Sequence, residues 1–255
     1  SHLYAPNCQM VLLTPQGRQT QPMPPDCAWR GSVVGGGEVR LAIAAGFIYG
    51  YLTPPSGEQV LIEPLHYWIT GAADDLYLVY NLPDAIQTHP LLCQTLPDEA
   101  HPAANPPDAL SGYRQNSGCR IVEIAFAADY LLTQEKGSAA KVTKHLTALL
   151  NAVQPSYEVF NIEFTLTQMV ISTCAACDGW SNTLDAPTLV NSFEQWGNAG
   201  GFTASYDVAQ LWTDRDFTGA VVGVSPVATL CTDSRYSLTQ DYSGNFNSLR
   251  ALSAH

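Results

Sequence analysis

Charged residues are scarce in this chain. Lysine, arginine, aspartate and glutamate make up 13% of the 255 residues, and 23 acidic against 11 basic side chains give a net charge of −12. A surface with so few basic groups repels the phosphates of nucleic acids and anionic membrane surfaces. The composition therefore excludes nucleic acid and acidic lipid as partners.

Several other features are missing from the sequence. The longest apolar run, from Leu41 to Leu52, is too short to span a bilayer and contains two glycines. There is no Asn-x-Ser/Thr acceptor for N-glycans, no GxSxG nucleophile elbow, and no glycine-rich phosphate loop followed by a lysine. We therefore predict no transmembrane segment, no α/β-hydrolase chemistry and no nucleotide-binding loop.

The chain does contain enough apolar residues, 46%, to build hydrophobic cores, and it has seven cysteines. Structural disulfides persist in oxidising compartments, so these cysteines in an acidic, lysine-poor chain predict a secreted, extracellular protein. A cytosolic protein with seven reduced and mostly buried thiols is the alternative.

The pattern of the chain changes near its middle. From about Met10 to Tyr80, short apolar runs are separated by glycine, proline and polar turns, which predicts a β-meander or sandwich. From Pro83 to Gly118 prolines recur among polar residues, as is typical of an extended linker. We expect a β-rich domain over residues 1–84, a linker over 85–117 and a second domain over 118–255, with separate cores in the two halves.

The second half mixes helical and strand periodicities. Alternating apolar residues predict strands, and apolar residues three and four apart predict a helix that Pro155 ends. Asp185 is a plausible N-cap for a further helix. The predicted segments are strands at 121–126, 160–171, 207–212 and 219–224 and helices at 142–153 and 187–196. The expected fold class is α+β, with a twisted mixed sheet and helices in the C-terminal half and an all-β N-terminal half.

Several segments of the second half occur in the same order in one protease family. Tyr206-Asp-Val-Ala-Gln-Leu-Trp-Thr213 is followed by Asp216-Phe-Thr-Gly219, and the chain closes on Leu249-Arg-Ala-Leu-Ser-Ala-His255. In order and spacing this half, from about Cys119 onward, resembles the upper catalytic subdomain of the adamalysin, or reprolysin-like, metzincin proteases. The β-rich half before it is similar to the pro-segment that such secreted proteases carry.

The resemblance implies a zinc site. Metzincins hold zinc with the motif HExxHxxGxxH on a helix, in which the glutamate is the general base. His255 corresponds to the first ligand, at the end of an apolar helical repeat that Asn245 or Ser243 could cap. The glutamate and the other ligands are expected beyond His255. We therefore assign no catalytic residue in this chain and expect the chain alone to be inactive and to bind zinc weakly.

The resemblance also implies a substrate strand and a latency switch. In that fold a peptide pairs antiparallel with the edge strand above the metal, which maps to Val221, Val222 and Gly223; a buried central strand is the alternative. In related zymogens a pro-segment thiolate occupies the fourth zinc position. Cys93, in the linker, is the candidate for this switch, and a disulfide between Cys93 and Cys119 is the structural alternative.

The remaining cysteines give three expectations. Cys174 and Cys177 form a CxxC without a second CxxC or a thioredoxin-like context, which favours a local disulfide. Cys8 and Cys27 bracket a proline-rich loop and are expected to pair. The resemblance places the partner of Cys231 beyond the end of this chain, so Cys231 is expected to be unpaired here.

Together these features predict the precursor of a secreted zinc-dependent endopeptidase. It would be a zymogen whose partners are protein or peptide substrates and its own inhibitory pro-segment, with Zn²⁺ as the cofactor of the complete protein. A non-enzymatic secreted two-domain protein, used for binding or assembly, is the alternative.

Overall fold

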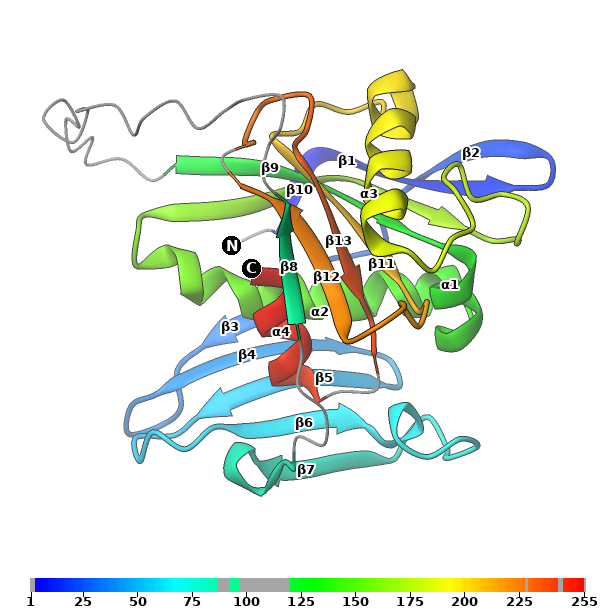
Figure 1. Cartoon of the computed structure of the whole chain (residues 1–255). Helices are drawn as coiled ribbons and strands as arrows, with labels where there is room; N and C mark the ends of the chain where they lie inside the picture. Colours follow the sequence, from blue (N-terminus) through cyan, green and yellow to red (C-terminus); the bar gives the residue numbers. More distant parts are fainter. Residues whose placement is uncertain (1–2, 87–91, 97–119, 228, 243–244, 255) are drawn as a thin grey trace, which may run out of the picture.

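The computed structural model describes residues 3–86, 92–96, 120–227, 229–242 and 245–254, with only the backbone of 92–96. Two β-sheets enclose a layer of helices (Figure 1). The larger, eight-stranded sheet has the order β2-β1-β10-β9-β11-β13-β12-β8, and the five-stranded sheet has the order β3-β4-β5-β6-β7. The fold class is α+β, as predicted, and the five-stranded sheet is the expected antiparallel meander.

The strands of the N-terminal half are β1 (Tyr4–Thr14), β2 (Gly17–Pro22), β3 (Ala28–Gly31), β4 (Glu38–Ala44), β5 (Phe47–Thr53), β6 (Val60–Pro64) and β7 (Tyr77–Asn81), followed by β8 (Leu92–Leu96). The C-terminal strands are β9 (Arg120–Ala128), β10 (Ile162–Ser172), β11 (Val208–Thr213), β12 (Val221–Pro226) and β13 (Tyr236–Gln240). The helices are α1 (Tyr130–Lys136), α2 (Ala139–Glu158), α3 (Ala186–Trp196) and α4 (Phe246–Ala254), with short 3-10 helices η1 (Leu65–Tyr67) and η2 (Leu82–Asp84) and a π-helical turn η4 (Gly197–Gly201).

The C-terminal half forms the middle of the larger sheet. Strands β10, β9, β11 and β13 run parallel, and β12 is antiparallel to β13. Side chains alternate across this sheet: Phe126 of β9 belongs to the core on the α2 side, whereas Ala125 and Ala127 belong to the core on the α3 side. The expected helix-backed sheet therefore has helices on both faces.

The two halves share one hydrophobic core, so the separate cores expected from the sequence are wrong. A single cluster of buried side chains joins Tyr49 and Leu61 of the five-stranded sheet to Leu146 of α2 and Phe126 of β9. Strand β1 extends the larger sheet by pairing in parallel with β10. Parallel partners can lie far apart in the sequence, so local patterns do not reveal this pairing. The domain boundaries at residues 84 and 117 remain a prediction.

Helix ends follow the capping chemistry of their residues. The Asp185 carboxylate accepts the Thr188 backbone N–H at 3.0 Å, which confirms the predicted N-cap of α3. Asn245 caps α4 in the same way, through the backbone N–H of Ser248. The expected end of α2 at Pro155 is wrong, because the helix continues to Glu158. Ion pairs of Glu158 with Arg30 and Arg40 stabilise this last turn.

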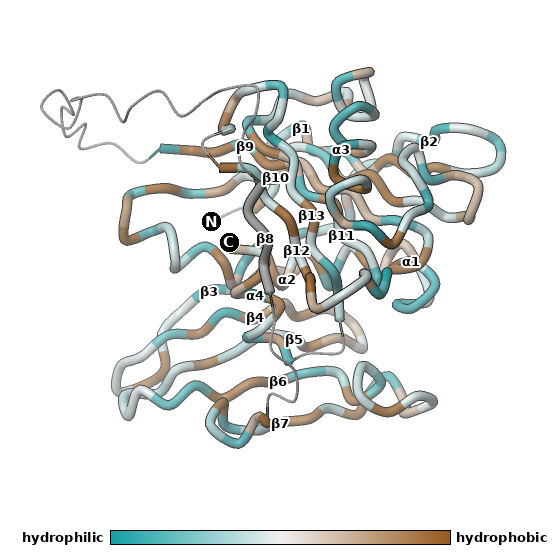
Figure 2. The backbone as a smooth tube through the Cα atoms, viewed as in Figure 1, coloured by the Kyte–Doolittle hydropathy of each residue, from teal (hydrophilic) through white to brown (hydrophobic). Residues whose placement is uncertain are grey.

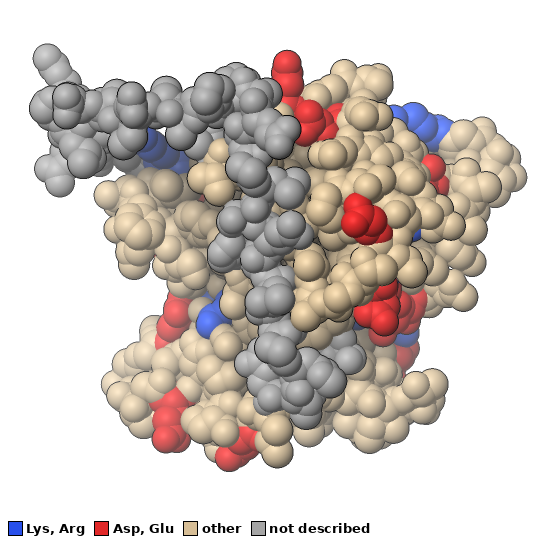
Figure 3. Space-filling view, viewed as in Figure 1, with Lys and Arg blue, Asp and Glu red and all other residues tan. Residues whose placement is uncertain are grey.

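The surface agrees with the composition. On the face shown in Figure 3 charged side chains are few and most of the surface is uncharged. Apolar stretches lie along the strands of both sheets (Figure 2), where they supply the two faces of the core. Among the described helices none is long and apolar enough to cross a membrane.

Candidate active site

The last turn of α4 lies against the larger sheet. The Ser253 hydroxyl donates to Oε1 of Gln210 on β11 at 3.2 Å, and Nε2 of Gln210 donates to the Thr239 hydroxyl on β13 at 2.9 Å. Thr239 is in turn the register partner of Gly223 on β12. These contacts place the end of α4, at Ala254, against the part of the sheet to which the predicted substrate strand belongs.

Strand β12 has a neighbour on each side. Val222 and Gly223 are buried, and Val221 is half-buried. One edge of β12 pairs with β13, and the other pairs in parallel with β8. The edge that was expected to receive a substrate is therefore covered by a strand that precedes the C-terminal half in the sequence (Figure 1).

Strand β8 also brings two predicted site residues together. In the register between β8 and β12, Cys93 is the partner of Gly223. Only the backbone of Cys93 is described, and Cys119 and His255 lie outside the described residues. The expected disulfide between Cys93 and Cys119 therefore stays an open alternative.

A zinc ion does not fit the described residues by themselves. Nowhere in the described ranges do three or more histidine, cysteine, aspartate or glutamate side chains gather closely enough to hold a metal. A catalytic zinc needs three protein ligands, and this sequence offers His255 as the predicted first of them. No catalytic step is therefore derived from the residues at hand.

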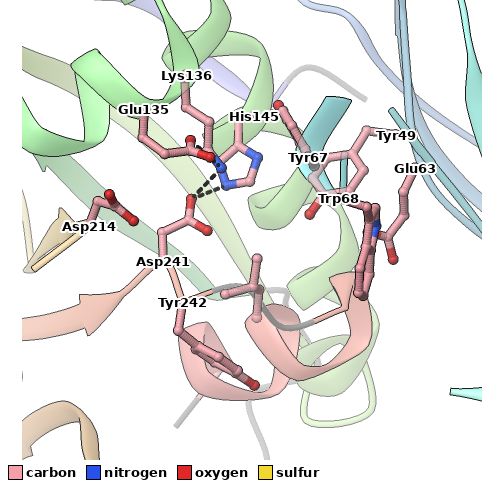
Figure 4. A pocket seen from close by; sticks show the side chains of 11 residues that line it. Tyr49, Glu63, Tyr67, Trp68, Glu135, Lys136, His145, Asp214, Asp241 and Tyr242 are labelled. Carbon is pink, nitrogen blue, oxygen red and sulfur yellow. Dashed lines mark hydrogen bonds and ion pairs between the residues drawn. The ribbon is translucent and has the colours of Figure 1, made fainter. Parts of the chain in front are cut away.

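The interface between the two halves contains a small polar cavity of about 70 Å³. Asp241 lies at its centre, with its Oδ2 2.6 Å from Nε2 of His145 and 3.2 Å from Nζ of Lys136 (Figure 4). Two aromatic rings of the N-terminal half close the other side: Tyr49 stacks on the imidazole of His145, and the ring of Tyr67 lies 4.3 Å from the Lys136 ammonium. Nearly all of this cluster is buried, so its charges are paired away from water.

Burial and neighbouring charges shift the pKa values of these groups in opposite directions. Burial lowers the pKa of His145 below its usual value, which keeps the imidazole neutral. Burial alone would raise the pKa of Asp241, but the Lys136 ammonium and the His145 imidazole together outweigh burial, so the pKa of Asp241 lies below its usual range. The resulting ion pair of Asp241 with Lys136 holds α1 against the end of β13.

The sequence indicated only part of this cluster. His145 falls on the apolar face of α2 that the helical repeat defines, so its burial could have been predicted. Its partners could not, because Lys136 and Asp241 lie on other elements and meet it only through tertiary packing.

Asp214 lies at the rim of the same cavity. Burial, with Glu135 and Asp241 acting in the same direction, raises the pKa of Asp214 to about 7. The folded state therefore favours the protonated carboxyl, and Asp214 costs stability as the pH rises from its unfolded pKa of about 3.9 through 7. We expect Asp214→Asn to raise the free energy of unfolding by about 1 kcal/mol at pH 8, after allowance for partial solvent exposure, and to have little effect near pH 4.

Thermal unfolding followed from pH 4 to pH 8 measures this prediction, with substitution of the exposed Asp216 by asparagine as the matched control. A difference between Asp214→Asn and wild type that stays constant over this pH range would contradict the raised pKa.

A second buried ionic cluster lies at the end of β11. The Arg215 guanidinium is 2% exposed and donates to Asp129 at 2.9 Å and to Asp178 at 3.0 Å. Asp129 also caps α1 by accepting the Leu132 backbone N–H. The cluster joins α1, β11 and the loop after β10. The buried guanidinium of Arg215 compensates the charges of Asp129 and Asp178 inside the protein.

Two of the three expectations for these cysteines are confirmed. Cys174 and Cys177 form the predicted local disulfide, and Cys231 is unpaired as expected. The expected Cys8–Cys27 disulfide is wrong, because both thiols are free. Cys8 lies on β1 in the larger sheet, whereas Cys27 directly precedes β3 of the smaller sheet, and the β1–β2 hairpin occupies most of the chain between them.

Comparison with known proteins identifies the family to which the C-terminal half is similar. A model of metallopeptidase family M12, of the reprolysin type, matches residues 118–253, more than half of the chain. The chain belongs to this metallopeptidase family. The match begins just before β9 and ends within α4, so it covers the helix-backed part of the larger sheet and the elements around the predicted site.

Two individual proteins that match this M12 member have low sequence identity to it. The snake venom metalloproteinase atroxlysin-1 of Bothrops atrox is 26% identical over 133 residues, which cover 49% of this chain and 62% of the relative. The chain thus spans less than two thirds of the length of that curated relative. A solved structure described as a chaperone-substrate complex aligns with 53% of this chain and 23% of its own chain, at a TM-score of 0.41 and 11% identity, a likeness too low to carry an argument.

Proposed function

We propose that this chain is part of a secreted zinc endopeptidase precursor of the metzincin type. One observation carries the proposal: α4 follows β13, ends at Ala254 directly before His255, and packs its last turn against the strands beside β12. A zinc-binding helix in this place would lie close to the proposed substrate strand. Zinc, held by His255 and ligands of a complete HExxHxxGxxH motif, would supply an activated water for peptide hydrolysis.

The proposed substrate site is the outer edge of β12. A peptide that replaced β8 there would pair with the backbone around Val221, Val222 and Gly223. Gly223 has no side chain and would permit a close backbone approach. An antiparallel substrate would run opposite to β8, which is parallel to β12.

The position of β8 supports a latent precursor. This strand belongs to the segment between the halves and uses the backbone edge that a substrate would need. Its reversed direction would leave it poorly presented for cleavage. Cys93, beside Gly223, is the proposed thiolate that holds the protein latent. The N-terminal half would then be the pro-segment, and the Cys174–Cys177 disulfide together with the venom relative supports secretion.

The function is tested with a chain extended through a complete HExxHxxGxxH motif. We expect this chain, once latency is relieved, to cleave an unfolded protein substrate, to lose the activity on addition of a zinc chelator, and to regain it when zinc is restored. The 255-residue chain, which lacks the remaining ligands, is the matched control and should be inactive. An extended, folded chain without chelator-sensitive activity would favour the non-enzymatic binding or assembly protein.

A further inference from the structure

The two halves are joined by much more than the chain between them. On one side, β1 continues the larger sheet, with Gln9 to Leu13 paired in unbroken register to Gln168 to Ser172 of β10. Alternate residues of β1 contribute backbone hydrogen bonds to β10 that would be lost on separation. Removing the N-terminal half would therefore expose a long edge of β10.

The smaller sheet forms the second contact, across α2. The side-chain amide of Asn151, on α2, donates to the carbonyl of Trp29 at 3.0 Å and of Leu41 at 3.2 Å. The guanidinium of Arg40 pairs with Glu158 at 2.8 Å. Asn151 and Arg40 are buried, and apolar side chains of both halves form one continuous cluster. An interface of this kind resembles the inside of a single domain rather than a transient contact.

The third contact is made to α4 itself. Glu63 of β6 is 1% exposed, and its carboxylate accepts the backbone N–H of Phe246, the first residue of α4, at 2.9 Å. Trp68 and Tyr80 donate to the same carboxylate and fix it in place. The first turn of a helix has unpaired N–H groups and a partial positive charge, so a buried carboxylate there stabilises the helix start. The ring of Phe246 packs 4.3 Å from the ring of Tyr49, between centroids.

Strand β8 is held differently. It is the last strand of the larger sheet and pairs only with β12 in the described part of the chain, with a shift in register between Val221 and Gly223. The element that covers the β12 edge is thus separate from the elements that hold α4. Strand β8 can therefore leave β12 while the smaller sheet stays bound to α4.

We propose that the N-terminal half stays bound to the C-terminal half after the chain is cut between them, and that Glu63 positions the first turn of α4 in this two-chain protein. Opening of the site would then consist of the departure of β8 from β12 alone. The proposal rests on the proposed function in one respect, the identity of α4 as the zinc helix. The interface itself is tested without any enzyme assay.

The first experiment uses the full 255-residue chain with the recognition sequence of a site-specific protease inserted between Asn105 and Pro106. After complete cleavage, gel filtration at neutral pH is run at successive dilutions. We expect both halves to co-elute at the volume of the uncut protein and to unfold in one thermal transition. Separate elution of an N-terminal half would overturn the proposal, whatever the activity of an extended chain.

The second experiment asks whether Glu63 positions α4. In the cleaved protein, Glu63→Ala should weaken the association of the halves by at least about tenfold, because it leaves the Phe246 N–H and two side-chain donors unpaired. Backbone hydrogen exchange should rise selectively in the first turn of α4, while exchange in β4 and β5 stays unchanged. Glu63→Gln, which keeps an acceptor oxygen, should restore much of this protection, and Glu58→Ala, at an exposed site, should have no effect.

The outcomes of this second experiment are equally decisive. Unchanged exchange in α4, or an equal rise in α4 and in the strands of the smaller sheet, would remove Glu63 as a positioning residue. Should Glu63→Ala fail to fold, the exchange of Glu63→Gln and the co-elution of the cleaved wild type still decide the proposal. An extended chain that is inactive while its cleaved halves co-elute would refute the proposed function and leave the interface standing.

Discussion

Asp241→Ala is expected to lower the free energy of unfolding by about 3–5 kcal/mol, because it leaves the buried Lys136 ammonium without its closest buried counter-charge. The side chains of Lys136 and Asp241 are 5% and 3% exposed, so solvent does not compensate for the loss. The substitution also removes the group that faces Nε2 of His145. This loss is large compared with the total stability of a typical domain, about 5–15 kcal/mol.

Chemical denaturation at neutral pH measures the loss. Asp74→Ala is the matched control, since it removes an exposed carboxylate that also pairs with a lysine, Lys141, and should change stability little. A double variant, Lys136→Met with Asp241→Leu, should recover much of the loss because it leaves no unpaired buried charge; Glu135, which also pairs with Lys136, is exposed to solvent. A small effect of Asp241→Ala would mean that Glu135, 3.0 Å from the same ammonium, or water in the cavity compensates the charge of Lys136.

The pH dependence of this loss follows from the pKa of Asp241. Because the folded state lowers the pKa of Asp241, its contribution to stability is complete above the unfolded pKa of about 3.9 and declines as the pH falls further. The difference between wild type and Asp241→Ala should therefore shrink below pH 4.

Cys93→Ser in the uncleaved, extended protein is expected to raise peptidase activity by at least about tenfold without any processing, since tenfold corresponds to only 1.4 kcal/mol of lost inhibitory binding. A serine hydroxyl is a much poorer zinc ligand than a thiolate, so the fourth metal position would become available to water. The backbone of β8 would still compete for β12, so activity should rise further when the linker is cut.

Cys8→Ser is the matched control for this prediction. Cys8 is a free thiol of the same N-terminal half, and burial raises its pKa to about 12, so it does not supply a thiolate. Cys8→Ser should leave the protein latent. Unchanged latency of Cys93→Ser, or a mapped disulfide between Cys93 and Cys119, would mean that the N-terminal half inhibits by steric cover or only assists folding.

Local chemistry made much of the fold predictable. The strand at 160–171 and the helix at 187–196 were placed within a few residues, because alternation and an Asp185 cap act within one element. The meander of the N-terminal half followed from turn residues between apolar runs. Pro155 was misleading, because α2 continues past it to Glu158, whose carboxylate pairs with Arg30 and Arg40.

Contacts between distant segments were not predictable. Neither the parallel pairing of β1 with β10 nor that of β8 with β12 leaves a local pattern, because their partners lie far away in the sequence. For the same reason the Glu63 contact to α4 and the cluster around Asp241 came only from the structure. The substrate strand was placed by a family resemblance. Its pairing with β8 was not predicted.

Zinc content tests the central claim most directly. A chain extended through the complete motif is purified without chelators, and its metal content is measured beside that of the same chain carrying His255→Ala. The account predicts one zinc per extended chain and a loss of most of that zinc in His255→Ala. A folded extended chain that binds no zinc, or zinc content that His255→Ala leaves unchanged, would contradict the assignment of α4 as the zinc-binding helix.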